Sequence, residues 1–198
     1  MIKREDDHVG YFVDKFLETV DNLPNEAIDV TIQALADVRD NGGRVFVLGM
    51  GGSAGNASHM VNDLRKLCGI EAYAPTDNVS EFSAWVNDAG PDEFFVNYLH
   101  ESKFNENDAI VVLSVGGGSL ERKISVSLVN AIVYATEVGA QAFSIVGKAD
   151  GYAAENTAAI VVPCLDPELV TPISEAMQAV VWHCIVSDPR LQVRKTTW

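Results

Sequence analysis

The sequence has 198 residues, of which 47% are hydrophobic and 21% are charged, a balance typical of a globular protein with its own hydrophobic core. Its 28 acidic and 14 basic side chains give a net charge of −14, which excludes an extended basic surface for nucleic acid or an anionic membrane. An anionic small ligand stays compatible with this charge, because the backbone N–H groups at a helix N-terminus can bind phosphate.

The cysteines and the N-terminal residues indicate the compartment. Cys68, Cys164 and Cys184 are widely spaced and form no CxxC pair, which is typical of reduced thiols in a cytoplasmic protein. Residues 1–7 are polar and lack the apolar core of a signal peptide, and no apolar run approaches the roughly 18 residues that span a membrane. We therefore expect a cytoplasmic protein without a membrane segment.

The order of the predicted elements indicates an α/β fold. Two helices are expected between residues 8 and 40, and from residue 44 onward short apolar strands alternate with helices. Strands buried on both faces are typical of a parallel sheet, so we expect a three-layer sandwich: a five-stranded parallel sheet with helices on both faces and two leading N-terminal helices. The expected strands are 44–48, 71–74, 109–113, 141–146 and 159–162, and the expected core helices are 53–67, 120–138 and 172–186, with short helical segments between 78 and 102.

We expect residues 1–198 to form a single domain. Residues 1–42 would be its N-terminal helical pair and residues 43–190 its α/β core, because no linker, repeat or low-complexity segment divides the chain.

Two of the strands end in glycine-rich turns that lead into helices, 49–53 and 114–119. Glycine lets the backbone approach a ligand closely, and a helix N-terminus offers free N–H groups and partial positive charge to a phosphate. Each turn alone could be only a tight connection, but both would lie at the carboxyl edge of the sheet, where ligands bind. The first turn has Ala54 where a dinucleotide fingerprint needs its third glycine, which argues against a dinucleotide site. The candidate binding residues are Gly51, Gly52, Ser53, Ser114, Gly116, Gly117, Gly118 and Ser119.

Polar residues on two helices are candidates for acid–base or metal chemistry. His59 and Asp63 are four residues apart on one helix face, and Glu175 and His183 are eight apart on the last helix. Imidazole and carboxylate groups form zinc sites and acid–base pairs, although an i, i+4 His–Asp pair is also common as a surface hydrogen bond. His183 interrupts an apolar run, so we expect it to be partly buried, either as a functional group or as a core histidine with a hydrogen-bond partner.

In this context the motifs resemble the sedoheptulose 7-phosphate isomerases (phosphoheptose isomerases) of the SIS fold. The resemblance is carried by the turn 49–53 with His59 six residues on, and by 87–90, 114–119 and 147–151, within residues 44–187. It implies an enzyme that interconverts a ketose phosphate and an aldose phosphate by proton transfer through an enediol. It also implies a homotetramer with sites at subunit interfaces and a phosphorylated sugar as the ligand.

The resemblance also implies roles for individual residues. Asp63 would be the base and His183 would shuttle a proton, or both would bind zinc with His59 and Glu175. Ser53, Ser114 and Ser119 would bind the phosphate, and Asn87 and Asp88 would contribute from the loop in the middle of the chain. The sequence departs from the family pattern in having Asp63 for a glutamate, Glu175 for a glutamine, and Val115 and Gly116 for hydroxyl residues. These departures indicate a divergent branch of the family. Because Val115 and Gly116 lack hydroxyl groups, more of the contacts to the phosphate would come from backbone N–H groups.

Two functions stay open on the sequence alone. The first is a sugar-phosphate isomerase, favoured because both helices carry more polar residues than a scaffold needs. The second is a non-catalytic regulator on the same fold, of the type that resembles replication-initiator-binding proteins and binds a sugar phosphate or a protein partner.

Overall fold

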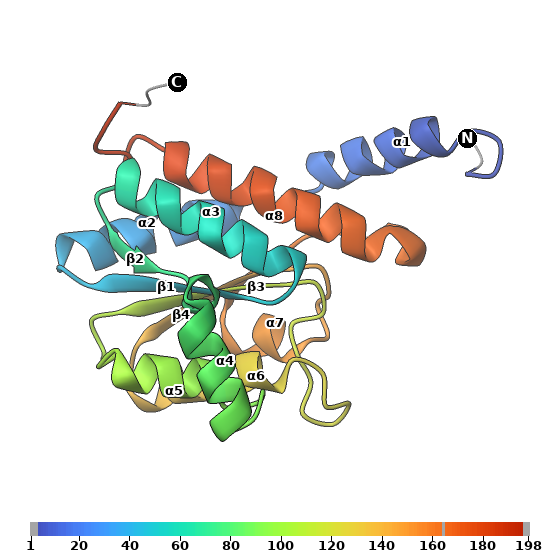
Figure 1. Cartoon of the computed structure of the whole chain (residues 1–198). Coiled ribbons are helices and arrows are strands. Elements are labelled where there is room, and N and C mark those ends of the chain that lie inside the picture. The colour runs from blue at the N-terminus through green and yellow to red at the C-terminus, as the bar shows by residue number, and fades with distance from the viewer. Residues whose placement is uncertain (1–3, 164, 196–198) are drawn as a thin grey trace.

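The computed structural model describes residues 4–163 and 165–195, so Cys164 lies outside the described residues. The chain begins with helices α1 (His8–Asp21) and α2 (Asn25–Asp40), as predicted. Helix α1 extends beyond the layers formed by the rest of the chain (Figure 1). It leaves Val9 and Leu17 72% and 56% exposed, while Phe12 and Phe16 pack against the core.

Five parallel strands form one sheet in the order β2-β1-β3-β4-β5, which confirms the predicted class of fold. Strands β1 and β3 are neighbours, and Gly49 at the end of β1 pairs in register with Leu113 of β3. The two glycine-rich turns therefore leave the same edge of the sheet side by side. The strands are β1 (Arg44–Gly49), β2 (Glu71–Tyr73), β3 (Ala109–Ser114), β4 (Gln141–Val146) and β5 (Ala158–Val161).

Helices cover both faces of the sheet (Figure 1). One face carries α2, α3 (Gly52–Lys66) and α8 (Val170–Ser187), whose buried side chains form one hydrophobic cluster with that face. The other face carries α4 (Val79–Asp88), α5 (Phe94–Glu101), α6 (Val126–Glu137) and α7 (Tyr152–Asn156), with a second cluster beneath them. Short 3₁₀ turns lie at Pro75–Asp77 and Pro167–Leu169.

The prediction of a helix over 120–138 was wrong at its start, because α6 begins at Val126. The preceding residues form a tight loop in which Ser119 and Ile124 exchange two backbone hydrogen bonds of 2.9 and 3.0 Å. Ser125 then takes a left-handed conformation (φ 48°) before the helix starts. Helix α7 was not predicted, since a helix of five residues shows too little periodicity to be recognised.

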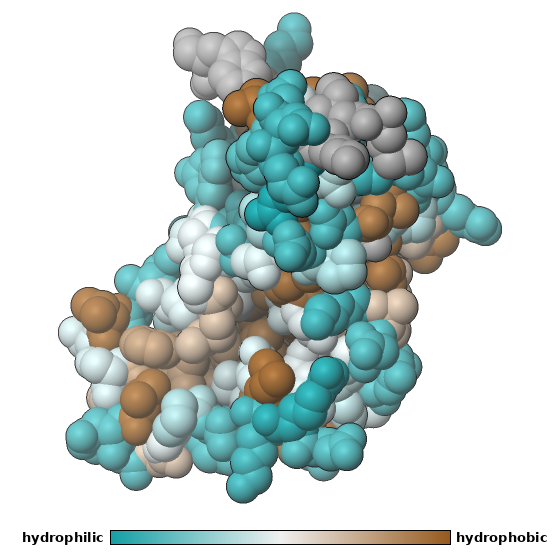
Figure 2. Space-filling model, turned by 90° about the vertical axis from the view of Figure 1, so that its right-hand side faces the viewer, coloured by the Kyte–Doolittle hydropathy of each residue, from teal (hydrophilic) through white to brown (hydrophobic). Residues whose placement is uncertain are grey.

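The segment Pro167–Ser187, which contains α8, is long and apolar enough to cross a membrane on length and composition, contrary to our expectation from the sequence. Half of it is buried, however, and α8 packs against α2, α3 and β4. A helix that is buried in a protein core can be as long and as apolar as a membrane-spanning helix. On the face in Figure 2, hydrophobic side chains form separate patches among hydrophilic ones. We therefore interpret α8 as a core helix.

Candidate active site

The first glycine-rich turn leads from β1 directly into α3. Gly51 precedes the helix with φ 61° and ψ −128°, a conformation that glycine adopts without strain. Gly52 lies against the carboxylate of Glu175 on α8: a Cβ added to Gly52 would lie 2.5 Å from Oε2. The side chain of Ser53 is buried beneath the turn. The N-terminus of α3 thus faces a carboxylate of its own chain.

The second turn is closed by its own serine, because the Oγ of Ser114 accepts a hydrogen bond of 3.0 Å from the N–H of Gly117. Gly117 and Gly118 both have positive φ, and both are packed: a Cβ on Gly118 would lie 2.7 Å from Cγ2 of Val129. Gly116 differs, since no atom lies within 4 Å of an added Cβ. Of the three candidate glycines here, only Gly116 faces open space.

The two turns share one pocket of about 230 Å³. Ser53 and Ser114 line it from their two turns, as the sequence predicts, and Glu175 lines it from α8. Ser125, the residue before α6, also lines it and was missed by the sequence analysis. Its position directly before the apolar run of α6 could have identified it as a residue at a helix N-terminus.

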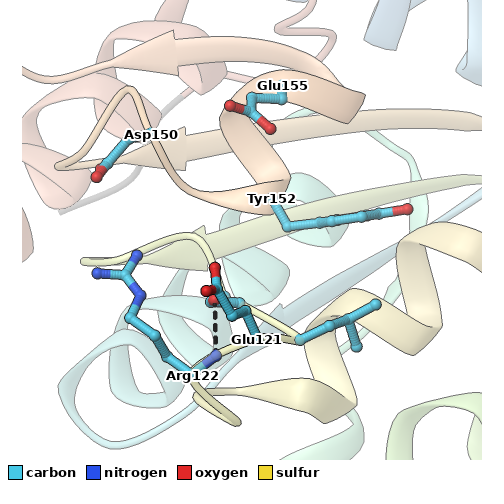
Figure 3. A pocket seen from close by; sticks show the side chains of 8 residues that line it. Glu121, Arg122, Asp150, Tyr152 and Glu155 are labelled. Carbon is cyan, nitrogen blue, oxygen red and sulfur yellow. Dashed lines mark hydrogen bonds between the residues drawn. The ribbon is translucent and has the colours of Figure 1, made fainter.

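Ser119 does not line this pocket but two neighbouring cavities, of about 320 and 540 Å³. Its Oγ accepts a hydrogen bond of 3.2 Å from the N–H of Arg122, which is the dashed line in Figure 3. The larger cavity is acidic on the sides formed by Glu121, Asp150 and Glu155 (Figure 3). Ser119 therefore shapes the loop after the second turn rather than the pocket between the turns.

Helices α3 and α8 pack side by side and form a polar seam that starts at the first turn. Beyond Gly52 and Glu175, the amide nitrogen of Asn56 donates two hydrogen bonds of 3.0 Å, to the backbone oxygen of Glu175 and to Oε1 of Gln178. One turn further, the ring of His59 contacts that of Trp182 edge-on at 4.6 Å between centroids. The seam thus leads from the glycine-rich turn to His59.

The far end of this seam brings together three candidate residues: His59, Asp63 and His183 offer ligand atoms that lie within 4.8 Å of one another. Nε2 of His59 is 3.9 Å from Oδ2 of Asp63, and the two imidazole centroids are 5.2 Å apart. Nδ1 of His183 lies 2.7 Å from the carbonyl oxygen of Ala179. A carbonyl only accepts, so Nδ1 carries a proton, and in the neutral form of the imidazole Nε2 is then the atom with the lone pair.

His183 is exposed, so the expectation that it is partly buried was wrong. The apolar run around it is buried on the side of Trp182, whose ring stacks on that of His183 at 3.6 Å between centroids. His183 itself turns outward with His59, whose side chain is 57% exposed, into an open cavity of about 570 Å³. The cluster is therefore accessible to a ligand or to another subunit.

The other candidates lie elsewhere. Glu175 is two helical turns, or about 12 Å along the axis, from His183, and it points into the pocket between the turns, not into the cluster. Asn87 and Asp88, at the end of α4, are exposed and hydrogen-bonded to each other at 2.7 Å. They line none of the cavities described above.

The cluster of His59, Asp63 and His183 fits a zinc ion by its donor chemistry. Two imidazoles and one carboxylate are a usual ligand set for zinc in enzymes that keep an open position. The hydrogen bond from Nδ1 of His183 to Ala179 is the support that metal-binding imidazoles commonly have, because it fixes the tautomer. Glu175 is not among the three grouped residues, so the expected four-residue set is present only in part.

The thiol of Cys68 is not suited to act as a nucleophile or a metal ligand. Burial raises the pKa of its thiol to about 12, and the thiol lies 3.6 Å from the backbone oxygen of Val186 in the core between α3 and α8. A thiol that stays protonated at neutral pH is a poor nucleophile and metal ligand.

Comparison with known proteins gives the family. The SIS domain family matches residues 11–147. The lincomycin biosynthesis protein LmbN of Streptomyces lincolnensis is 33% identical over 180 residues, which are 85% of this chain and 64% of that protein, so the chain spans less than two thirds of this relative. A phosphoheptose isomerase of Geotalea daltonii is 30% identical over 158 residues, or 77% of this chain and 79% of the relative.

Solved structures agree with these relatives. A phosphoheptose isomerase from Francisella tularensis superposes with a TM-score of 0.76 at 25% identity, over 93% of this chain and 97% of that one. The phosphoheptose isomerase GmhA of Neisseria gonorrhoeae, at 21% identity and a TM-score of 0.78, shares the fold over 92% of this chain and 96% of its own. The chain therefore belongs to the phosphoheptose isomerase family of SIS-domain proteins.

Proposed function

We propose that the chain is an aldose–ketose isomerase that interconverts sedoheptulose 7-phosphate and a heptose 7-phosphate. The observation that carries the proposal is the cluster of His59, Asp63 and His183, joined by one helix seam to the glycine-rich turns. Acid–base groups at one end and an open, glycine-lined pocket at the other suit a substrate with a reactive carbonyl and a distal phosphate. Relatives named phosphoheptose isomerase favour this enzyme over the non-catalytic regulator.

Asp63 would take the proton from the carbon beside the carbonyl. That C–H bond breaks, its electron pair forms the C=C bond of the enediolate, and the carbonyl oxygen takes up the proton that the hydroxyl on the adjacent carbon gives up. Nε2 of His183 faces the same space as Asp63 and would move the proton between the two oxygens. Return of the first proton to the adjacent carbon completes the transfer, with no net gain or loss of atoms.

As the alternative role of the same cluster, His59, Asp63 and His183 are the residues that would hold a zinc ion. When bound there, zinc would polarise the substrate's carbonyl and stabilise negative charge on its oxygen. Asp63 has one methylene less than the family's glutamate, so its carboxylate reaches less far from α3. Its side chain is only 14% exposed, which limits the positions it can take.

A coupled assay with sedoheptulose 7-phosphate and added zinc tests the proposal. Asp63→Asn and His183→Ala should each lower kcat by about 100-fold or more, the usual contribution of a positioned acid or base. Asp37→Asn on α2 and His100→Ala on α5 make the same chemical changes at exposed positions outside the cavity and should keep kcat within about twofold. Absence of turnover with every ketose phosphate tried, for the zinc-loaded wild type, would exclude the isomerase.

We also propose a cytoplasmic homotetramer with the sites between subunits. Two features support assembly: the cluster of His59 and His183 is open to solvent, and α1 exposes apolar residues on one face, including Val9, Val13 and Leu17. A tetramer would cover both. Light scattering that gives the mass of a monomer at micromolar concentration would contradict the assembly and leave the chemistry of the cluster to be tested by the assay.

A further inference from the structure

The buried indole of Trp182 contacts two of the three residues in the cluster. Its ring stacks on that of His183, with 3.6 Å between centroids and 26° between planes, and it meets the ring of His59 edge-on at 4.6 Å and 67°. The two imidazoles are themselves nearly perpendicular, at 5.2 Å and 87°. The three rings therefore form one packed group that joins α3 to α8, and Trp182 is its fully buried member.

The stack between Trp182 and His183 does not follow from their being neighbours in the chain. Consecutive residues of a helix point about 100° apart, so their side chains do not normally face each other. The ring of His183 meets the indole because it lies toward the N-terminus of α8, where its Nδ1 donates to the carbonyl oxygen of Ala179, one turn earlier. The indole and this hydrogen bond thus hold the imidazole from two directions.

Both imidazoles need support because they lie at the surface. The side chain of His59 is 57% exposed, and His183 is exposed in the same open cavity. An exposed side chain samples several rotamers, and ordering it when a ligand binds costs free energy. A buried ring that orders both imidazoles beforehand removes much of that cost. Asp63 depends less on such support, because its side chain is only 14% exposed.

An indole at this position has a cost in stability. Its Nε1–H is buried and has no hydrogen-bond partner among the described residues, as is also true of Ser174 Oγ and Gln178 Nε2 on the same stripe of α8. Ser174 lies against Gly147, and Gln178 accepts a hydrogen bond from Asn56. Contact with both imidazoles is what distinguishes Trp182 from these two residues. Leucine could fill the core here without an unpaired N–H, but it would offer no ring to the cluster.

We propose that Trp182 is a positioning residue, which holds the imidazoles of His59 and His183 in the mutual orientation that the cluster needs to bind zinc or to move protons. The face of an indole carries negative charge density, and an imidazole that shares its lone pair with a metal becomes electron-poor, so the stack also favours the metal-bound form. The inference rests on the proposed function for turnover, whereas zinc binding by the cluster can be measured without a substrate.

The test compares Trp182→Leu and Trp182→Phe with Ile185→Val. Ile185 is fully buried on the same helix and lines no part of the cavity of the cluster, so its substitution loosens the packing of α8 without removing a ring. Calorimetry with zinc should show the Kd raised by about 5- to 50-fold in Trp182→Leu, the equivalent of two lost ring contacts. With saturating zinc, kcat for sedoheptulose 7-phosphate should fall by about 10- to 100-fold, with KM within about threefold.

The other two variants show whether the ring or the packing matters. Trp182→Phe, which keeps a ring, should lie between Trp182→Leu and the wild type in zinc Kd and kcat, and Ile185→Val should match the wild type within about twofold. Thermal unfolding gives the Tm of each variant, and the assays are run well below the lowest Tm. If zinc Kd and kcat follow the Tm rather than the ring at residue 182, Trp182 acts through packing alone and the proposal is overturned. If Trp182→Leu does not fold, Trp182→Phe decides, because its zinc Kd and kcat must then differ from the wild type by more than those of Ile185→Val.

The outcomes separate this proposal from the isomerase. Weaker zinc binding in Trp182→Leu, with no turnover by the wild type, supports the role of Trp182 and removes the isomerase. Turnover by the wild type, with zinc Kd and kcat in both Trp182 variants equal to those of Ile185→Val, overturns the role of Trp182 and keeps the isomerase. If the wild type turns over substrate without binding zinc, a fall in kcat in Trp182→Leu supports the role and an unchanged kcat overturns it. A wild type that neither binds zinc nor turns over a ketose phosphate overturns both proposals.

Discussion

The two glycine-rich turns come after neighbouring strands, yet their glycines serve different purposes. In the first turn Gly51 has positive φ and no atom near an added Cβ, and Gly52 faces a side chain that can move. In the second, Gly117 and Gly118 have positive φ and pack against residues 151–153 and Val129. The glycines of the first turn thus let the chain enter α3 beside Glu175, whereas Gly117 and Gly118 make close packing possible and Gly116 lines the pocket.

The turns also lead into different segments. Helix α3 begins at Gly52, inside the first turn, so its N-terminal N–H groups lie at the pocket. Helix α6 begins at Val126, after the loop that carries Arg122. The first turn therefore contributes a helix N-terminus to the site, and the second contributes a loop that precedes its helix.

The largest effect should come from filling the packed glycine. Gly118→Ala should lower the free energy of unfolding by about 2–4 kcal/mol, because its Cβ would lie 2.7 Å from Cγ2 of Val129 and its φ is +83°. Gly116→Ala, two residues earlier in open space, should change it by less than about 1 kcal/mol. Urea unfolding measures both. Equal losses in the two variants would contradict the division of roles within the second turn.

A smaller effect should come from the seam that joins the first turn to α8. Asn56→Ala removes both hydrogen bonds to α8 and leaves the buried amide oxygen of Gln178 without its partner. A buried polar group left unpaired costs about 1–3 kcal/mol, so the free energy of unfolding should fall by that amount.

The matched control for the seam is Asn62→Ala. Asn62 is exposed on the same helix, and among the described residues its side chain bonds only that of Asp63, so its loss should cost less than about 0.5 kcal/mol. Combining Asn56→Ala with Gln178→Leu should recover part of the loss, since the buried amide of Gln178 is then removed together with its partner. Failure of the double variant to recover would mean that Asn56 acts through contacts other than Gln178.

The sheet and its helices could be predicted because strands such as 109–113 are continuously apolar and the helices between them are periodic. The pairing of Ser53 with Ser114 in one pocket followed from the rule that ligands bind at the carboxyl edge of a parallel sheet. The late start of α6 could not be predicted, because residues 120–125 are compatible with a helix and only the backbone bonds between Ser119 and Ile124 exclude it.

The directions in which side chains point from α8 also could not be predicted from the sequence. Spacing placed Glu175 and His183 broadly on one side of the last helix, but a separation of two turns lets one side chain face the first turn while the other joins His59. The burial of His183 was wrong for a related reason: an apolar run does not say which way a single polar residue in it points. Trp182, directly before it, takes the buried position.

The smallest change in stability, and the sharpest comparison with the second turn, should come from Gly52→Ala. Its Cβ would meet only the end of the Glu175 side chain, which can rotate away, and alanine is up to about 1 kcal/mol better than glycine in a helix. The free energy of unfolding should therefore change by less than about 1 kcal/mol, in contrast to Gly118→Ala. Binding of sedoheptulose 7-phosphate should nevertheless weaken, because the carboxylate of Glu175, which lines the pocket, is displaced.

Gly55→Ala on the same helix is the control, since no atom lies within 4 Å of its added Cβ. It should stabilise the fold by up to about 1 kcal/mol and leave binding unchanged. If Gly52→Ala unfolds the protein as readily as Gly118→Ala, the carboxylate of Glu175 is fixed in place and the first turn is packed like the second. If both Gly52→Ala and Gly55→Ala keep full affinity, the substrate does not lie against Glu175 at the N-terminus of α3.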